Sequence, residues 1–177
     1  MPRQPDGRES VLKVLIAEDD PFFRRLLQKL LASECEVSTA EDGDAAWTQL
    51  QRSDGPVLAI LDWVMPGMAG PQLCREVRAN PTTAGIYLIL LTARNSAADI
   101  LSGMRAGADD FVTKPFEPEE LRVRVRLGRK VLELRQSIMA HESALADALA
   151  RERVLQARLT ALEQTLRAGS IPKSATA

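Results

Sequence analysis

The sequence predicts an α/β fold in which five parallel strands form a doubly wound sheet with helices on both faces. Three observations carry this prediction. Five short apolar segments recur within about 120 residues, a helical pattern separates each segment from the next, and polar residues follow the segments at their carboxyl ends. Regular alternation of strands and helices is typical of parallel sheets.

The first part of the chain supplies three strands and two helices. Residues 11–17 are almost continuously apolar, as expected for a strand covered on both faces. A helix over 21–33 starts at a proline and places apolar side chains on one face. Residues 35–40 alternate like a half-covered strand, and residues 42–51 suit a short helix. The third strand, over 57–61, is again apolar throughout.

The next part continues the alternation. A loop rich in proline and glycine leads to a helix over 71–79. Residues 86–91 form an apolar strand, and the helix over 96–108 ends near a glycine. A short strand over 109–113 completes the sheet, and the last helix starts near Pro118.

Composition narrows the class of protein. The chain of 177 residues has 23 basic and 24 acidic residues, whereas a whole-chain nucleic-acid binder would be far more basic. An apolar content of 45% argues against disorder throughout, and no apolar run approaches the roughly 18 residues of a membrane span. The charge is divided unevenly, with 12 basic and 19 acidic residues over 1–120 but 10 basic and 5 acidic residues over 121–168. We therefore expect an acidic globular unit followed by a basic helical one.

Two further features concern the compartment. The first ten residues are polar and contain no apolar signal core. Cys35 and Cys74 have no companion cysteines or histidines at metal-binding spacing. We expect both to be buried, free thiols of a cytoplasmic protein.

Polar residues end four of the predicted strands. They are Glu18-Asp19-Asp20, Asp62, Thr92 and Lys114. Ligands of doubly wound sheets bind outside the carboxyl ends of the strands. Carboxylates gathered there repel one another, and a divalent cation would relieve the repulsion; oxygen ligands favour Mg²⁺ over zinc. The alternative is that the acidic run merely caps a helix, a role we expect mainly for Asp20.

Four motifs stand in order at these strand ends: AEDD at 17–20, LDWVMPGMAG at 61–70, LTA at 91–93 and DDFVTKPF at 109–116. Together they resemble the receiver domain of two-component response regulators over about residues 11–125. The resemblance implies a flavodoxin-like fold and phosphorylation by a histidine kinase or phosphotransfer protein. It implies no enzymatic activity beyond the domain's own phosphorylation and slow autodephosphorylation.

The resemblance also assigns roles to the site residues. Asp62 would be the phosphoacceptor, and Lys114 would pair with the acyl phosphate. Asp19, Asp62 and the backbone carbonyl of Val64 would bind Mg²⁺, with Glu18 acting mainly through water. A carboxylate nucleophile suits this reaction because it forms a mixed anhydride with phosphate.

Further roles concern the response to phosphorylation. The hydroxyl of Thr92 would donate to a phosphoryl oxygen, and Phe111 would be an aromatic switch that moves with it. Val64 and Arg94 occupy the two positions that tune the lifetime of the phosphoryl group. Because apolar Val64 offers no hydrogen bond to an attacking water, we expect slow autodephosphorylation. The peptide bond before Pro115 is expected to be cis.

From residue 127 onward, apolar residues recur at alternating intervals of four and three, the period of a left-handed coiled coil. The predicted seam contains Leu127, Val131, Leu134, Ile138, Leu145, Leu155, Leu159, Leu162 and Leu166. β-branched residues at a and leucine at d favour a parallel pair, so we expect a parallel homodimer. His141 also falls in the seam, where it either has a register-setting or pH-sensitive role or is a tolerated polar residue.

These patterns divide the chain into a disordered tail over 1–10, a receiver over 11–126, a coiled-coil helix over 127–168 that continues the last receiver helix, and a disordered tail over 169–177. The basic stretch at 122–130 superficially resembles a zipper-type DNA-binding region, but we expect a solvated or salt-bridged helix face instead. The output would then pass to an unknown protein partner. In the alternative, the chain is the receiver and linker of a larger regulator such as a diguanylate cyclase. A phosphatase with an Asp-x-Asp pair is disfavoured, because the second aspartate is absent after Asp62.

Overall fold

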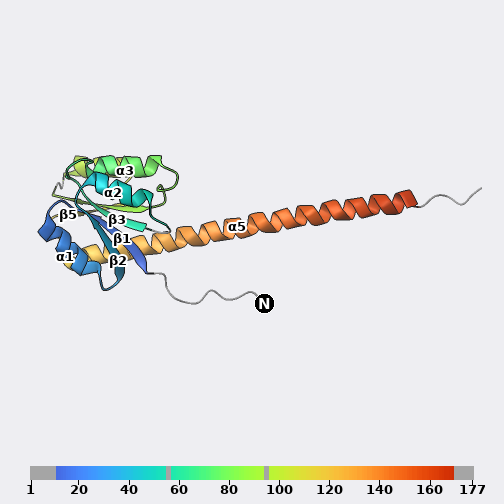
Figure 1. The fold of residues 1–177 in the computed structure, drawn as a ribbon, viewed down its shortest axis with the longest axis horizontal. Coiled ribbons are helices and arrows are strands. Elements are labelled where there is room, and N and C mark those ends of the chain that lie inside the picture. Colours follow the sequence, from blue (N-terminus) through green and yellow to red (C-terminus); the bar gives the residue numbers. More distant parts are fainter. Residues whose placement is uncertain (1–10, 55–56, 94–95, 170–177) are drawn as a thin grey trace, which may run out of the picture. The chain divides into compact units, whose positions relative to one another are not determined.

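The computed structural model describes residues 11–54, 57–93 and 96–169. The predicted tail at 1–10, residues 170–177 of the predicted tail at 169–177, and Arg94 lie outside the described residues, and Gly169 is the last residue of the final helix. The elements follow one another as β1 (Leu12–Ala17), α1 (Pro21–Leu31), β2 (Cys35–Ala40), α2 (Gly43–Gln51), β3 (Val57–Asp62), α3 (Gly70–Ala79), β4 (Tyr87–Thr92), α4 (Ala97–Arg105), β5 (Asp110–Thr113) and α5 (Pro118–Gly169) (Figure 1).

The five strands form one parallel sheet in the order β2-β1-β3-β4-β5, which confirms the predicted fold class. The chain changes direction across the sheet between β1 and β3, the place where doubly wound sheets carry their sites. The pairing of Asp62 with Leu91 and of Thr92 with Thr113 brings the carboxyl ends of β3, β4 and β5 to the same edge.

Both faces of the sheet are buried, which explains the continuous apolar runs in the sequence. In β4, Leu88 and Leu90 belong to one core cluster, and the alternate residues Ile89 and Leu91 belong to the other. Figure 1 shows α2 and α3 together on one side of the sheet, with α1 and the start of α5 on the other. Alternating side chains therefore face two different layers of helices.

Helix α5 lies unusually close to the sheet at Gly128. A Cβ atom at this position would lie 2.6 Å from a methyl carbon of Leu58 and 2.7 Å from the ring of Tyr87. The close approach thus requires glycine, although glycine in a helix interior is less favourable than alanine by about 1 kcal/mol.

The chain comprises two compact units, one ending at Leu134 and the other starting at Arg135. In the first unit, α5 contributes Leu121, Val125 and Leu132 to the core. In the second unit, every side chain described from Gln136 onward is exposed. None of the helices in the described ranges combines the length and apolarity that a bilayer crossing requires.

Candidate functional site

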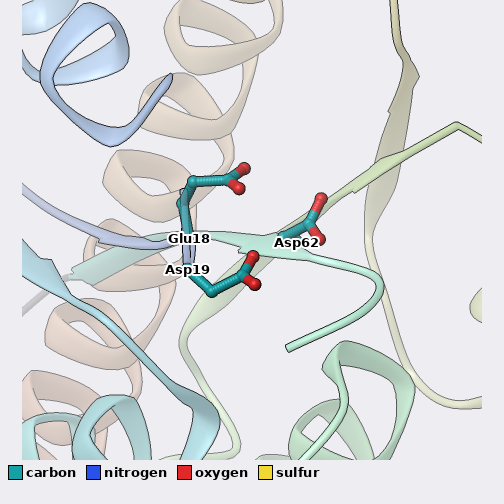
Figure 2. A group of neighbouring side chains, drawn as sticks. All are labelled: Glu18, Asp19 and Asp62. Atoms are coloured by element: carbon teal, nitrogen blue, oxygen red, sulfur yellow. The ribbon is translucent and has the colours of Figure 1, made fainter. Parts of the chain in front are cut away.

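Three carboxylates meet at the carboxyl edge of the sheet (Figure 2). Glu18 and Asp19 directly follow β1, and Asp62 ends β3, so the strand order brings them together. One oxygen from each residue lies within 4.8 Å of the corresponding oxygens of the other two. Glu18 and Asp62 are buried, at 2% and 8% exposure, whereas Asp19 is exposed.

Lys114, which follows β5, bridges the two buried carboxylates. Its ammonium donates to Glu18 Oε2 at 2.7 Å and to Asp62 Oδ1 at 2.6 Å. Burial raises the pKa of Glu18, and the hydrogen bond from Lys114 opposes that rise. Burial alone would lower the pKa of Lys114, but its bonds to Asp62 and Glu18 outweigh this effect and raise it. The peptide bond from Lys114 to Pro115 is cis, as the resemblance to receiver domains implied.

One aromatic ring lies against the ammonium, a contact that the sequence did not indicate. The Lys114 nitrogen lies 4.3 Å from the ring centroid of Phe23 on α1, within the range of a cation–π contact. Phe23 in turn packs edge-on against Phe116, with centroids 5.9 Å apart. An apolar groove of about 390 Å³ adjoins these rings. No local pattern marks Phe23 for this role, because the contact depends on how α1 is rotated about its axis.

The loop between β1 and α1 is tied down by hydrogen bonds at several points. Asp20 caps α1, and one of its carboxylate oxygens accepts from the backbone N–H groups of Phe22 at 2.7 Å and Phe23 at 3.0 Å. This confirms the capping role expected for Asp20. The guanidinium of Arg24 donates to the carbonyl oxygens of Glu18 and Asp19. Sequence reasoning missed Arg24, because a basic residue one turn into the helix after an acidic run describes Arg24 and Arg25 equally.

The two predicted switch residues lie on neighbouring strands, Thr92 at the end of β4 and Phe111 on β5. Thr92, at the end of β4, is only 1% exposed, and its carbonyl accepts from the backbone N–H of Lys114 at 2.7 Å. Phe111 on β5 is half-buried and packs against the core cluster that contains residues of α2 and α3. Val64 is exposed, and its N–H donates to Asp62 Oδ2 at 3.1 Å. Hydrogen bonds therefore link Asp62 to Val64 and to Lys114, and link Lys114 to Thr92.

One residue of the predicted seam, Val131, differs in burial from the others. Leu127 and the predicted members from Leu134 onward are exposed, namely Leu134, Ile138, Leu145, Leu155, Leu159, Leu162 and Leu166. Val131 instead packs in part against the core of the first unit. The His141 ring nitrogen Nδ1 lies 2.6 Å from the backbone carbonyl oxygen of Ser137, one turn earlier.

The basic stretch of α5 contacts groups of the protein itself. The partners include Asp110 for Arg124, Glu119 for Arg122 and Arg126, and the carbonyl oxygen of Glu34 for Arg129. These contacts match the salt-bridged helix face expected from the sequence. Cys35 and Cys74 are buried free thiols, also as expected.

The donor set of the acidic cluster suits a small, hard divalent cation. Its three carboxylates supply oxygen ligands, and Lys114 neutralises only part of their charge. Oxygen donors and few carboxylates are typical of Mg²⁺ sites, and the exposure of Asp19 leaves one side of the cluster open to solvent. The residues present therefore fit the cation expected from the sequence.

Comparison with known proteins agrees with this geometry. A family model described as the response regulator receiver domain matches residues 14–126. The phosphate regulon transcriptional regulatory protein PhoB of Rhizobium meliloti is 42% identical over 115 residues, which cover 64% of this chain and 50% of PhoB. The response regulator PleD of Caulobacter vibrioides is also 42% identical over 115 residues, covering 64% of this chain and 25% of PleD. The chain thus spans about half the length of one curated relative and a quarter of the other.

Solved structures of response regulators align with most of this chain. The receiver domain of the Francisella response regulator 1452 aligns with a TM-score of 0.62 and 29% identity, over 67% of this chain and 97% of that domain. The Vibrio cholerae chemotaxis protein CheY4 aligns with a TM-score of 0.62 and 29% identity, over 66% of this chain and 98% of CheY4.

Proposed function

Because the chain belongs to the response regulator receiver family of two-component systems, we propose that it is a phosphoacceptor whose Asp62 is phosphorylated by a histidine kinase or phosphotransfer protein. The observation that carries this proposal is the buried Asp62 carboxylate, hydrogen-bonded to Lys114 and grouped with Glu18 and Asp19. Two free, buried thiols suit a reducing compartment, so the proposal places the protein in the cytoplasm.

The reaction is a phosphoryl transfer between the two proteins. An Asp62 carboxylate oxygen attacks the phosphorus of the donor phosphohistidine, a P–O bond forms and the P–N bond breaks. The electron pair of the broken bond stays on the imidazole, which takes up a proton. The product is a mixed anhydride.

The protein contributes mainly charge and position. Lys114 already contacts Asp62, so its ammonium stands beside the point where phosphoryl charge arrives. Glu18, Asp19, Asp62 and the backbone carbonyl of Val64 would hold Mg²⁺, which supplies further charge stabilisation when bound. Buried Thr92 would respond to the new phosphoryl oxygen and Phe111 would move with it.

Phosphorylation from a small-molecule phosphodonor tests the assignment. The wild type with Mg²⁺ should gain one phosphoryl group by intact mass, labile to hydroxylamine as an acyl phosphate is. Asp62→Asn should gain none. Asp54→Asn, which changes an exposed carboxylate outside the cluster, should behave as wild type. Equal labelling of Asp62→Asn and wild type would refute the assignment.

The lifetime of the phosphoryl group provides a second test. The exposed Val64 side chain has no polar atom to orient a water toward Asp62. The acyl phosphate should therefore persist for minutes or longer in the purified protein. Its loss within seconds would contradict the lifetime role of Val64.

The second unit supports output through association. Its exposed leucines repeat at the coiled-coil period, and a helix of this kind needs a partner for its apolar stripe. The proposed partner is a second copy in parallel register, and the signal passes through the paired helices to another protein. In such a pair, Arg158 of one chain stands opposite Glu163 of the other at g and e′.

Matched variants test the pairing. Leu155 falls at d of the seam, and its neighbour Val154 lies off the seam, yet their exposures are similar at 59% and 54%. Leu155→Asp should convert a dimer to a monomer in light scattering, whereas Val154→Asp should leave the dimer intact. A wild type that is monomeric at tens of micromolar would overturn the proposed homodimer.

A further inference from the structure

The side chain of Arg24 donates hydrogen bonds to the main chain of the acidic loop that precedes α1. One guanidinium nitrogen, Nη1, donates to the carbonyl oxygen of Glu18 at 2.5 Å and to that of Asp19 at 3.2 Å. Arg24 is half-buried on α1, one turn beyond the Asp20 cap. Its neighbour Arg25 is exposed. The two adjacent arginines thus differ in environment although they are chemically identical.

The two carbonyls belong to residues whose side chains join the acidic cluster. Glu18 is also fixed through its side chain by Lys114, and its N–H donates to the carbonyl of Ala40 at 3.2 Å. Asp19 is exposed, and the bond from Arg24 reaches its main chain directly. Fixing the peptide groups on either side of an exposed carboxylate limits the directions in which that carboxylate can point.

The geometry points to Arg24 as a positioning residue of the Mg²⁺ site, one that pre-arranges Glu18 and Asp19 without contacting the cation. This inference rests on the proposed function, since it assumes that the acidic cluster binds Mg²⁺. Groups that orient metal ligands from outside typically contribute 10–100-fold to metal affinity. Nη1 carries two N–H groups, one for each carbonyl, and the planar guanidinium fixes their directions, whereas the ammonium of lysine rotates on a flexible stem.

If Arg24 acted only through its charge, its removal would strengthen Mg²⁺ binding. Whether Mg²⁺ binding becomes weaker or stronger therefore distinguishes a positioning role from a purely electrostatic one. A positive charge near a cation site repels the cation, so removing it should strengthen Mg²⁺ binding. If Arg24 acts by position, its removal should weaken binding instead. Arg25 offers the matched control, because its loss changes the net charge equally while leaving the two carbonyl bonds in place.

Calorimetric titration of the full chain with Mg²⁺ tests the inference. Arg24→Met should bind Mg²⁺ about tenfold more weakly than wild type, and Arg24→Lys, which keeps the charge, should also bind more weakly. Arg25→Met should bind as tightly as wild type or slightly more tightly. Amide hydrogen exchange at 18–20, measured without Mg²⁺, should be faster in both Arg24 variants than in Arg25→Met.

The outcomes separate the two proposals. If wild type binds Mg²⁺ and both Arg24 variants bind it equally or more tightly, the positioning role is refuted while the proposed function stands. Should Arg24→Met fail to fold, Arg24→Lys decides, and wild-type affinity in that variant refutes the role. If the wild type binds no Mg²⁺, or if Asp62→Asn binds it unchanged, the magnesium site itself fails and the positioning role fails with it.

Discussion

Replacing Lys114 with methionine would remove the ammonium that bridges Glu18 and Asp62. Breaking a buried ion pair costs about 3–5 kcal/mol, whereas exposed pairs contribute about 0–1 kcal/mol. The Lys114 side chain is 23% exposed, and those of Glu18 and Asp62 are 3% and 12% exposed. Solvent reaches the ammonium more than the carboxylates, so we expect an intermediate loss of about 2–3 kcal/mol in the free energy of unfolding.

The same variant should respond more strongly to Mg²⁺. A ligand that binds only the folded state stabilises it by an amount that grows with the ratio of ligand concentration to Kd. In the wild type the cation must compete with Lys114 for the Asp62 carboxylate, whereas in Lys114→Met it would relieve carboxylate repulsion that nothing else offsets. Adding Mg²⁺ should therefore raise the unfolding temperature of Lys114→Met more than that of wild type.

Thermal unfolding followed by circular dichroism, with and without Mg²⁺, measures both effects. At about 4 °C per kcal/mol, the loss without Mg²⁺ corresponds to a fall of about 10 °C. Lys29→Met, which removes an exposed charge near the end of α1, should stay within about 0.5 kcal/mol of wild type. The reasoning would be wrong if Lys114→Met matched Lys29→Met in stability, or if its response to Mg²⁺ did not exceed that of wild type.

Three further predictions concern positions around this site and the core. In chemical denaturation, Gly128→Ala should lower the free energy of unfolding by about 1–2 kcal/mol, because overpacking against Tyr87 outweighs the gain in helix propensity. The control Gly85→Ala, at a position with open space around it, should leave the free energy of unfolding unchanged. Burial raises the pKa of Cys74 to about 12, so its thiol should resist alkylation at pH 8 in the folded protein and react on unfolding, as peptide mass analysis would show. The hydrogen bonds from backbone N–H groups lower the pKa of Asp20. The stabilising effect of its carboxylate is therefore present above the ordinary pKa near 3.8 and is lost as pH falls through the lower folded-state pKa. The difference in unfolding temperature between Asp20→Ala and wild type should accordingly disappear in strong acid.

The strands and the acidic cluster could be predicted because both depend on patterns along the chain. Continuous apolar runs indicated strands covered on two faces, and residues at successive strand ends must share one edge of a parallel sheet. The sequence therefore predicts that Glu18, Asp62 and Lys114 lie together. The structure then added their mutual hydrogen bonds and their burial.

Contacts that depend on the rotation of a helix could not be predicted in this way. Arg24 and Arg25 are adjacent and identical in type, and only the packing of α1 turns the first toward the acidic loop. Phe23 reaches Lys114 for the same reason. The heptad count likewise places Val131 in the seam, but the count takes no account of the sheet, and the structure packs Val131 in part against the core of the first unit.

Helix α5 carries two apolar stripes, one that faces the sheet and one that forms the predicted seam. The angle between them around the helix decides whether the proposed association of two chains would disturb the packing on the sheet. The sheet-facing positions 121, 125, 128 and 132 follow steps of four, three and four residues. The seam positions 127 and 131 each precede one of these by a single residue, which is a rotation of about 100° around the helix. The proposed pairing along the seam would therefore use a face of α5 largely separate from the sheet-facing one, with Val131 at the boundary between them. Leu155→Asp should accordingly abolish association. At concentrations where the wild type is itself monomeric, the variant should unfold the first unit at the same temperature as the wild type. A large loss of stability under those conditions would show that the two faces are not independent.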